Sequence, residues 1–144
     1  MKKIVIYSDG GARGNPGPSA IGFIIKDSKK TIAECGSFIG VTTNNVAEYE
    51  AVKSALQNLI ERNLIPVVVT CFLDSELVVK QLNGIYKVKQ EHLKIYYNFV
   101  SDIVNKLKER GCREVCFKYV PREKNQEADQ LVNEALDKVM KVSA

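Results

Sequence analysis

The chain has 144 residues, of which 45% are hydrophobic and 26% charged, and its formal net charge is +4. This length suits a single domain spanning residues 1–144 with a core of its own. No apolar run approaches the roughly 20 residues of a membrane span, and Met1-Lys2-Lys3 leads directly into a strand pattern rather than a signal peptide. The totals therefore exclude a membrane-spanning protein and favour a cytoplasmic globular one.

The distribution of charged residues and of cysteines bears on the possible partners and metal sites of the chain. Residues 85–124 hold ten basic and five acidic side chains, and such an excess either attracts a polyanion or forms an ordinary solvated face. The cysteines lack the C-x-x-C spacing of a zinc site, so we expect reduced thiols in or near the core. They are Cys35, Cys71, Cys112 and Cys116.

The first part of the chain predicts three strands and a helix. Residues 3–8 (KIVIYS) have the apolar character of a buried strand, and residues 19–26 and 31–39 predict a hairpin around the turn 27–30. A helix start follows at TTNN (42–45), with apolar residues at helical spacing as far as Ile60.

The second part predicts two strands and three helices. Residues 67–73 (VVVTCFL) form an uninterrupted apolar strand, which indicates that both faces are covered and that the strand pairs in parallel near the sheet centre. Helices are expected at 76–82, about 91–109 and about 125–139, with a strand at 114–120 between the last two. The order predicts an α/β domain that joins an antiparallel hairpin to parallel strands.

Four acidic residues fall at the ends of these elements. Asp9 and Asp74 end the first and fourth strands, and Glu48 and Asp129 lie in the first turns of two helices. Sites in open α/β sheets form beyond the carboxyl ends of neighbouring strands. We therefore expect the four side chains to converge at one edge of the sheet.

Converging carboxylates repel one another unless they are protonated or a cation neutralises them. Oxygen-only ligands favour Mg²⁺ or Mn²⁺, and no nearby histidine or cysteine offers a softer ligand. Taken singly, Asp74 can instead cap helix 76–82, and Glu48 and Asp129 can be favourable helix-dipole charges. Asp9 is different, because burying an acid directly after the apolar strand KIVIYS costs free energy unless a partner neutralises its charge.

The stretch DGGARGNPG (9–17) begins at this acid. It has neither the Rossmann spacing nor the G-K-[ST] of a Walker A loop. Its glycines let backbone N–H groups approach a ligand closely, and Arg13 and Asn15 add side-chain donors. A loop of this kind suits a sugar–phosphate backbone.

Four blocks together resemble the type 1 ribonuclease H family from about residue 4 to 139: YSDGGARGNPGPSAIGFII, TTNNVAEYEAVKSAL, LDSELVVKQLNG and REKNQEADQLVNEAL. The resemblance implies a mixed five-stranded sheet in the order 3-2-1-4-5 with helices on both faces. It also implies endonucleolytic hydrolysis of the RNA strand of RNA–DNA hybrids with two Mg²⁺ ions, or Mn²⁺, leaving 5′-phosphate and 3′-hydroxyl ends.

The resemblance also assigns roles to residues. The catalytic and metal-binding acids of the family fall on Asp9, Glu48, Asp74 and Asp129. Family contacts to RNA 2′-hydroxyls fall on Gly10, Gly11, Asn15, Asn44 and Asn45, and a contact to a DNA-strand phosphate falls on Thr43. The expected partner is an RNA–DNA hybrid, with double-stranded RNA as a second substrate to test, and we expect a monomer without an obligate protein partner.

Three features depart from the family pattern. The loop VPREKNQEAD has no histidine, and Arg122 is our candidate substitute, with an ordinary surface arginine as the alternative. The basic, tryptophan-rich protrusion is absent, so Lys87 and Lys89 are expected to give a smaller, salt-sensitive grip. Val41 stands where some relatives have a basic residue, which puts the DNA-phosphate pocket in question.

Two other functions are compatible with parts of the pattern. A non-catalytic hybrid-binding module would share the fold, but a protein that only binds the hybrid gains no affinity from clustered acids near the phosphates. A nucleotide phosphotransferase of actin-like architecture also begins its phosphate loops with an acid and glycines. That architecture needs two such domains, whereas this chain has the length of one.

Overall fold

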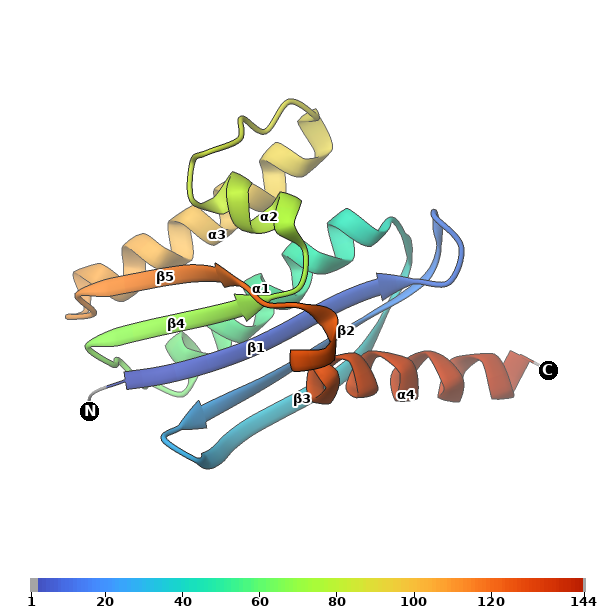
Figure 1. Ribbon diagram of the computed structural model, residues 1–144, viewed down its shortest axis with the longest axis horizontal. Helices are drawn as coiled ribbons and strands as arrows, with labels where there is room; N and C mark the ends of the chain where they lie inside the picture. Colours follow the sequence, from blue (N-terminus) through green and yellow to red (C-terminus); the bar gives the residue numbers. More distant parts are fainter. Residues whose placement is uncertain (1–2, 144) are drawn as a thin grey trace.

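The computed structural model describes residues 3–143 as one mixed sheet with helices on both faces (Figure 1). The sheet order β3-β2-β1-β4-β5 confirms the predicted architecture. β1 pairs antiparallel with β2 and parallel with β4; β2–β3 is antiparallel and β4–β5 parallel. The strands are β1 (Lys3–Ala12), β2 (Gly17–Asp27), β3 (Lys30–Thr42), β4 (Val68–Leu73) and β5 (Glu114–Tyr119).

The helices lie on the two faces unequally. α1 packs on β1 and β2 and contacts α3, whereas α4 packs on the opposite face against β1, β2 and β3. None of the helices within residues 3–143 has both the length and the apolar character needed to cross a bilayer. The helical elements are α1 (Asn44–Glu61), α2 (Glu76–Leu82), α3 (Glu91–Glu109), the 3₁₀ turn η1 (Arg122–Lys124) and α4 (Gln126–Ser143).

Strand β4 corrects one prediction. Val69, Cys71 and Leu73 are fully buried in the core cluster that also holds residues of α1 and α3, but the residues that alternate with them are only partly buried. The reason is that α4 packs on β1, β2 and β3, so Phe72 is covered on that face by ring stacking with Tyr7 at 5.1 Å. The parallel pairing was predicted correctly, but coverage of both faces was not.

Strand β1 corrects a second prediction, because it runs on through Asp9, Gly10 and Gly11 to Ala12. Asp9 therefore lies inside a strand, opposite Gly22 of β2, and does not end it. Its parallel neighbour β4 stops one position earlier, since Leu73 pairs with Ser8. Asp9 thus lies next to the point where β4 ends, and this offset creates the room for a site.

The cysteines agree with the sequence prediction. All four are free thiols; Cys71 and Cys112 are buried, and Cys35 and Cys116 are partly buried. Burial raises the pKa of each thiol above its ordinary value. None of them takes part in the acidic cluster described below.

Candidate active site

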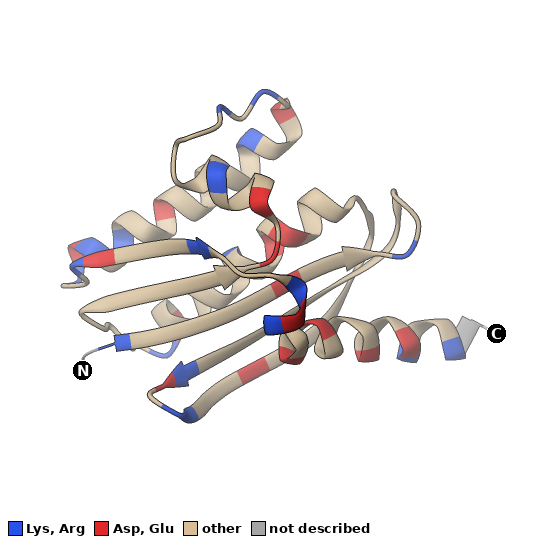
Figure 2. Cartoon of the chain, viewed as in Figure 1, with Lys and Arg blue, Asp and Glu red and all other residues tan. Residues whose placement is uncertain are grey.

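Three carboxylates from different elements meet where β4 ends. Asp9 of β1, Glu48 of α1 and Asp74 just after β4 each offer an oxygen, and these oxygens lie within 4.8 Å of one another. Asp9 and Glu48 are each only 6% exposed. Figure 2 shows the acidic segments of these elements and of the start of α4 grouped around the same end of the sheet. The structure thus brings together residues up to 65 positions apart in the chain.

Glu48 reaches the cluster because α1 packs very closely on β1. The helix begins at Asn44 and has no acid in its first turn, so Glu48 lies one turn further in than expected. The backbone of Gly10 contacts that of Ala47, and the Gly10 N–H hydrogen-bonds to the Glu48 carboxylate. The glycine next to Asp9 therefore serves helix packing, a role that the loop interpretation of this stretch did not anticipate.

The crowding changes the acidity of the two buried carboxyls. Burial, followed by the charge of Asp74, raises the pKa of Asp9 from 3.8 to about 7. Burial, followed by the charges of Asp9 and Asp74, raises the pKa of Glu48 well above its usual value. Together the three groups hold more negative charge than a dry site tolerates without protons or a cation.

The donor set fits a hard divalent cation. All three ligands are carboxylates, and Glu48 Oε2 is buried without a hydrogen-bond partner, which leaves a lone pair to bind an ion. Neither a histidine nor a cysteine belongs to this cluster in the part of the chain that the structure describes. Oxygen-only sites select Mg²⁺ or Mn²⁺ over zinc or copper.

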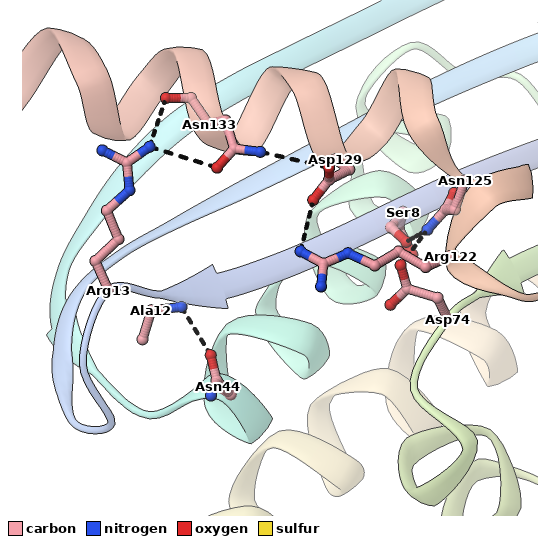
Figure 3. A network of polar contacts seen from close by, with 9 residues as sticks. All are labelled: Ser8, Ala12, Arg13, Asn44, Asp74, Arg122, Asn125, Asp129 and Asn133. Carbon is pink, nitrogen blue, oxygen red and sulfur yellow. Dashed lines mark hydrogen bonds and ion pairs between the residues drawn. The ribbon is translucent and has the colours of Figure 1, made fainter.

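Asp129 lines the same cavity, of about 550 Å³, and lies outside the group of three whose oxygens are within 4.8 Å of one another, but its charge and its hydrogen bond to Asp9 help to raise the pKa of Asp9. It lies in the first turn of α4, as expected. Arg122 Nη2 lies 3.4 Å from its Oδ1, and Asn133 Nδ2 donates to its Oδ2 at 3.4 Å (Figure 3). Arg122 therefore lies beside a candidate ligand, and its side chain is 77% exposed.

Asp74 is not a helix cap. Ser75 caps α2, because its side-chain oxygen accepts a hydrogen bond from the N–H of Val78. The Asp74 carboxylate instead accepts a hydrogen bond from Asn125 Nδ2 at 3.3 Å. The alternative left open by the sequence is thereby removed, and the carboxylate is directed to the cluster.

The loop between β1 and β2 is fixed to the start of α1. Asn44 Oδ1 accepts from the Ala12 N–H at 2.8 Å, and the Asn44 N–H donates to Asn15 Oδ1 at 3.0 Å. Thr43 caps α1 through its side-chain oxygen, which accepts from the Val46 N–H. Gly10, Gly11, Asn44 and Asn45 line the cavity with the acids. Asn15 and Thr43 are not among the lining residues, and each hydrogen-bonds to the start of α1.

The other departures from the family pattern lie at the surface. Val41 is 72% exposed on the edge strand β3. Lys87 and Lys89 are exposed in the connection between α2 and α3, which appears as basic segments beyond the acidic group in Figure 2. Their predicted contact with nucleic acid stays a prediction.

Sequence reasoning missed Asn125, Asn133 and Ser8 around the cluster. Asn125 is 1% exposed and Ser8 is fully buried. The available signal was an asparagine immediately before a helix, four residues ahead of an acid, but such a residue usually caps the helix without other contacts. Only the packed structure shows which groups the side chain reaches.

Comparison with known proteins adds independent information. Residues 7–135 match the family described as reverse transcriptase-like. A bifunctional protein of Mycobacterium tuberculosis, Rv2228c, is 36% identical over 137 residues; the match covers 94% of this chain but 36% of that protein. Ribonuclease HI of Halobacterium salinarum is 35% identical over 136 residues, which cover 94% of this chain and 65% of the relative. The chain thus spans about a third of the mycobacterial relative.

Solved structures are similar over their full length. LC11-RNase H1 in complex with an RNA/DNA hybrid is 47% identical with a TM-score of 0.87, and the match covers 95% of this chain and 99% of that one. RNase H1 of Halobacterium salinarum has a TM-score of 0.85 at 34% identity, over 94% of this chain and 98% of that one. The N-terminal RNase H domain of Rv2228c has a TM-score of 0.89 at 34% identity and covers 100% of both chains.

Proposed function

This chain belongs to the reverse transcriptase-like family and, within it, to the type 1 ribonucleases H, and we propose that it hydrolyses the RNA strand of RNA–DNA hybrids. The observation that supports the proposal most directly is the meeting of Asp9, Glu48 and Asp74 within 4.8 Å beside a cavity that Asp129 also lines. A non-catalytic binder gains nothing from such charge near phosphates.

The four acids would hold two divalent ions. With such ions bound, the site would supply an activated water and stabilisation of the leaving 3′-oxygen, and the products would carry 5′-phosphate and 3′-hydroxyl ends. The contribution of the chain itself is to fix the ligands: Gly10 brings α1 against β1, and Ser75 leaves Asp74 free of the helix cap. Arg122 supplies positive charge at the open side of the site, next to Asp129.

Recognition of the RNA strand rests on the 2′-hydroxyl, which DNA lacks. In our proposal the backbone at Gly10 and Gly11 and the side chains of Asn44 and Asn45 meet these hydroxyls from the cavity rim. Asn15 joins them, since its carbonyl oxygen is bonded to α1 and its amide group keeps two donors. Thr43 is assigned to a DNA-strand phosphate.

We further propose that the chain acts as a monomer in the cytoplasm, where removal of RNA primers or stray hybrids accompanies DNA replication. The resident ion is Mg²⁺ in this proposal, with Mn²⁺ as a functional substitute. Sedimentation analysis tests the oligomeric state.

A cleavage assay tests the proposed activity. End-labelled RNA–DNA hybrid, double-stranded RNA and double-stranded DNA are incubated with Mg²⁺, with Mn²⁺ and with EDTA. We expect metal-dependent cuts in the RNA strand of the hybrid and none in EDTA. Asp9→Asn should abolish cleavage while hybrid binding, measured by fluorescence anisotropy, persists. Metal-independent binding without cleavage by the wild type would favour the binding module instead.

A further inference from the structure

Asn125 is a buried side chain between the elements that carry the acids. It precedes α4 directly, is 1% exposed, and lies 117 residues from Ser8 and 51 residues from Asp74 in the chain. Its Nδ2 donates to the Ser8 carbonyl oxygen at 2.9 Å and to Asp74 Oδ2 at 3.3 Å, as Figure 3 shows. A primary amide has two N–H donors, and both are used.

The orientation of this amide is fixed by its partners. Both neighbours are acceptors, so rotating the amide by half a turn would place its oxygen against the Ser8 carbonyl and the Asp74 carboxylate. In the observed orientation Asn125 Oδ1 is buried without a partner in the described part of the chain. The bonds to Ser8 and Asp74 therefore outweigh the cost of burying one unsatisfied acceptor.

The same residue also holds the helix that carries the fourth acid. The backbone carbonyl of Asn125 accepts the N–H of Asp129 at 3.1 Å, which starts the first turn of α4. One residue thus joins β1 at Ser8, the end of β4 at Asp74, and the helix turn of Asp129. Its donation to one oxygen of Asp74 leaves the other oxygen for the three-acid cluster.

We propose that Asn125 is a positioning residue, which orients Asp74 for a divalent ion and fixes the distance between the three-acid cluster and Asp129. The inference rests on the proposed function, because it assumes that these acids hold the ions. Hydrogen-bonding partners of metal ligands of this kind change metal affinity or activity by about 10- to 100-fold when they are removed.

The first test uses the wild-type chain and needs no catalysis. In ¹⁵N-labelled protein, Mg²⁺ is titrated while the side-chain amide signals of Asn125 and the backbone signal of Gly10 are followed by NMR. We expect both to shift with the same saturation curve. A shift of Gly10 with unchanged Asn125 signals would overturn the positioning role alone. If Gly10 does not respond either, the metal site itself, and with it the proposed function, is contradicted.

The second test removes the amide. Asn125→Ala should raise the Mg²⁺ dissociation constant, read from Gly10, by about tenfold and lower kcat by a similar factor with KM for the hybrid unchanged. In an Asp74→Asn background the same change should add little, because its partner is already altered. Additive effects, or a fall in melting temperature alone, would show that Asn125 is merely structural.

A control with the same type of hydrogen bond is the exposed Asn83, whose Nδ2 donates to the Phe117 carbonyl oxygen of β5 at 3.0 Å. It offers the same amide-to-strand hydrogen bond away from the acids. Asn83→Ala should leave the Mg²⁺ affinity and kcat at their wild-type values. An equal loss in both variants would assign the effect to general destabilisation and overturn the proposal.

Discussion

A Cβ atom added to Gly10 would collide with the backbone carbonyl group of Ala47, so the backbones of β1 and α1 are in direct contact. No side chain other than hydrogen fits between them. This contact is what brings Glu48, the next residue of α1, to the acidic cluster. The glycine therefore determines the geometry of the site from the core side.

Gly10→Ala should separate α1 from β1 and move Glu48 away from Asp9. We expect a destabilisation of about 1–3 kcal/mol, as for other overpacked cores, and a loss of cleavage that exceeds it. Urea denaturation and single-turnover cleavage measure the two effects. Gly11→Ala is the control for stability, because its Cβ would meet only Val132 Cγ1, at 3.7 Å. Equal stability of the two variants would contradict the packing argument.

Asp9→Asn should change the pH dependence of stability in EDTA. Burial and the charge of Asp74 raise the pKa of Asp9 from 3.8 to about 7 in the folded protein, so the folded chain binds this proton more tightly than the unfolded chain. Stability therefore falls as pH rises between these values, and the variant should show a smaller fall and a higher melting temperature at pH 8. Thermal unfolding from pH 4 to 8 tests this. With Mg²⁺ present, the stability of the wild type should rise rather than fall with pH, because the ion replaces the proton on Asp9.

Arg122→Ala should reduce kcat by about 10-fold or more while leaving the melting temperature nearly unchanged. The pair with Asp129 is exposed on the arginine side, and exposed ion pairs contribute little to stability. Arg122→Lys should retain part of the rate. The control is Arg62→Ala, which should keep wild-type kcat. The Nε atom of Arg62 donates to Asn58 Oδ1 on the surface of α1. Wild-type kcat in Arg122→Ala would identify an ordinary surface arginine.

Tyr49→Phe should destabilise the fold without changing catalysis. The hydroxyl of Tyr49 donates to Gln81 Oε1 at 2.6 Å in a buried position and ties α1 to α2. Leaving this acceptor unpaired costs about 1–3 kcal/mol, measured as a lower urea midpoint. The double variant Tyr49→Phe/Gln81→Leu should recover part of the loss, because no buried polar group then lacks a partner. A further loss of stability in the double variant would show that side-chain packing, and not the hydrogen bond, accounts for the effect of Tyr49→Phe.

The sequence alone determined the elements and their order. Apolar periodicity, the turn at 27–30 and the helix start at TTNN (42–45) are local signals, and they predicted five strands and four main helices correctly within the described residues. The resemblance added the sheet order, which the structure confirms. The acids were singled out because each lies at the end or in the first turn of a predicted element, and this position can be read from a single chain segment.

The tertiary structure alone decided how the acids are held. Three features depend on contacts between distant segments. β1 continues past Asp9, β4 is covered fully on one face only, and Asn125 reaches Ser8 and Asp74. Such contacts follow from the offset of neighbouring strands and from the absence of a side chain at Gly10, and no local periodicity encodes either. The sequence determines which groups are present; close packing determines which of them meet.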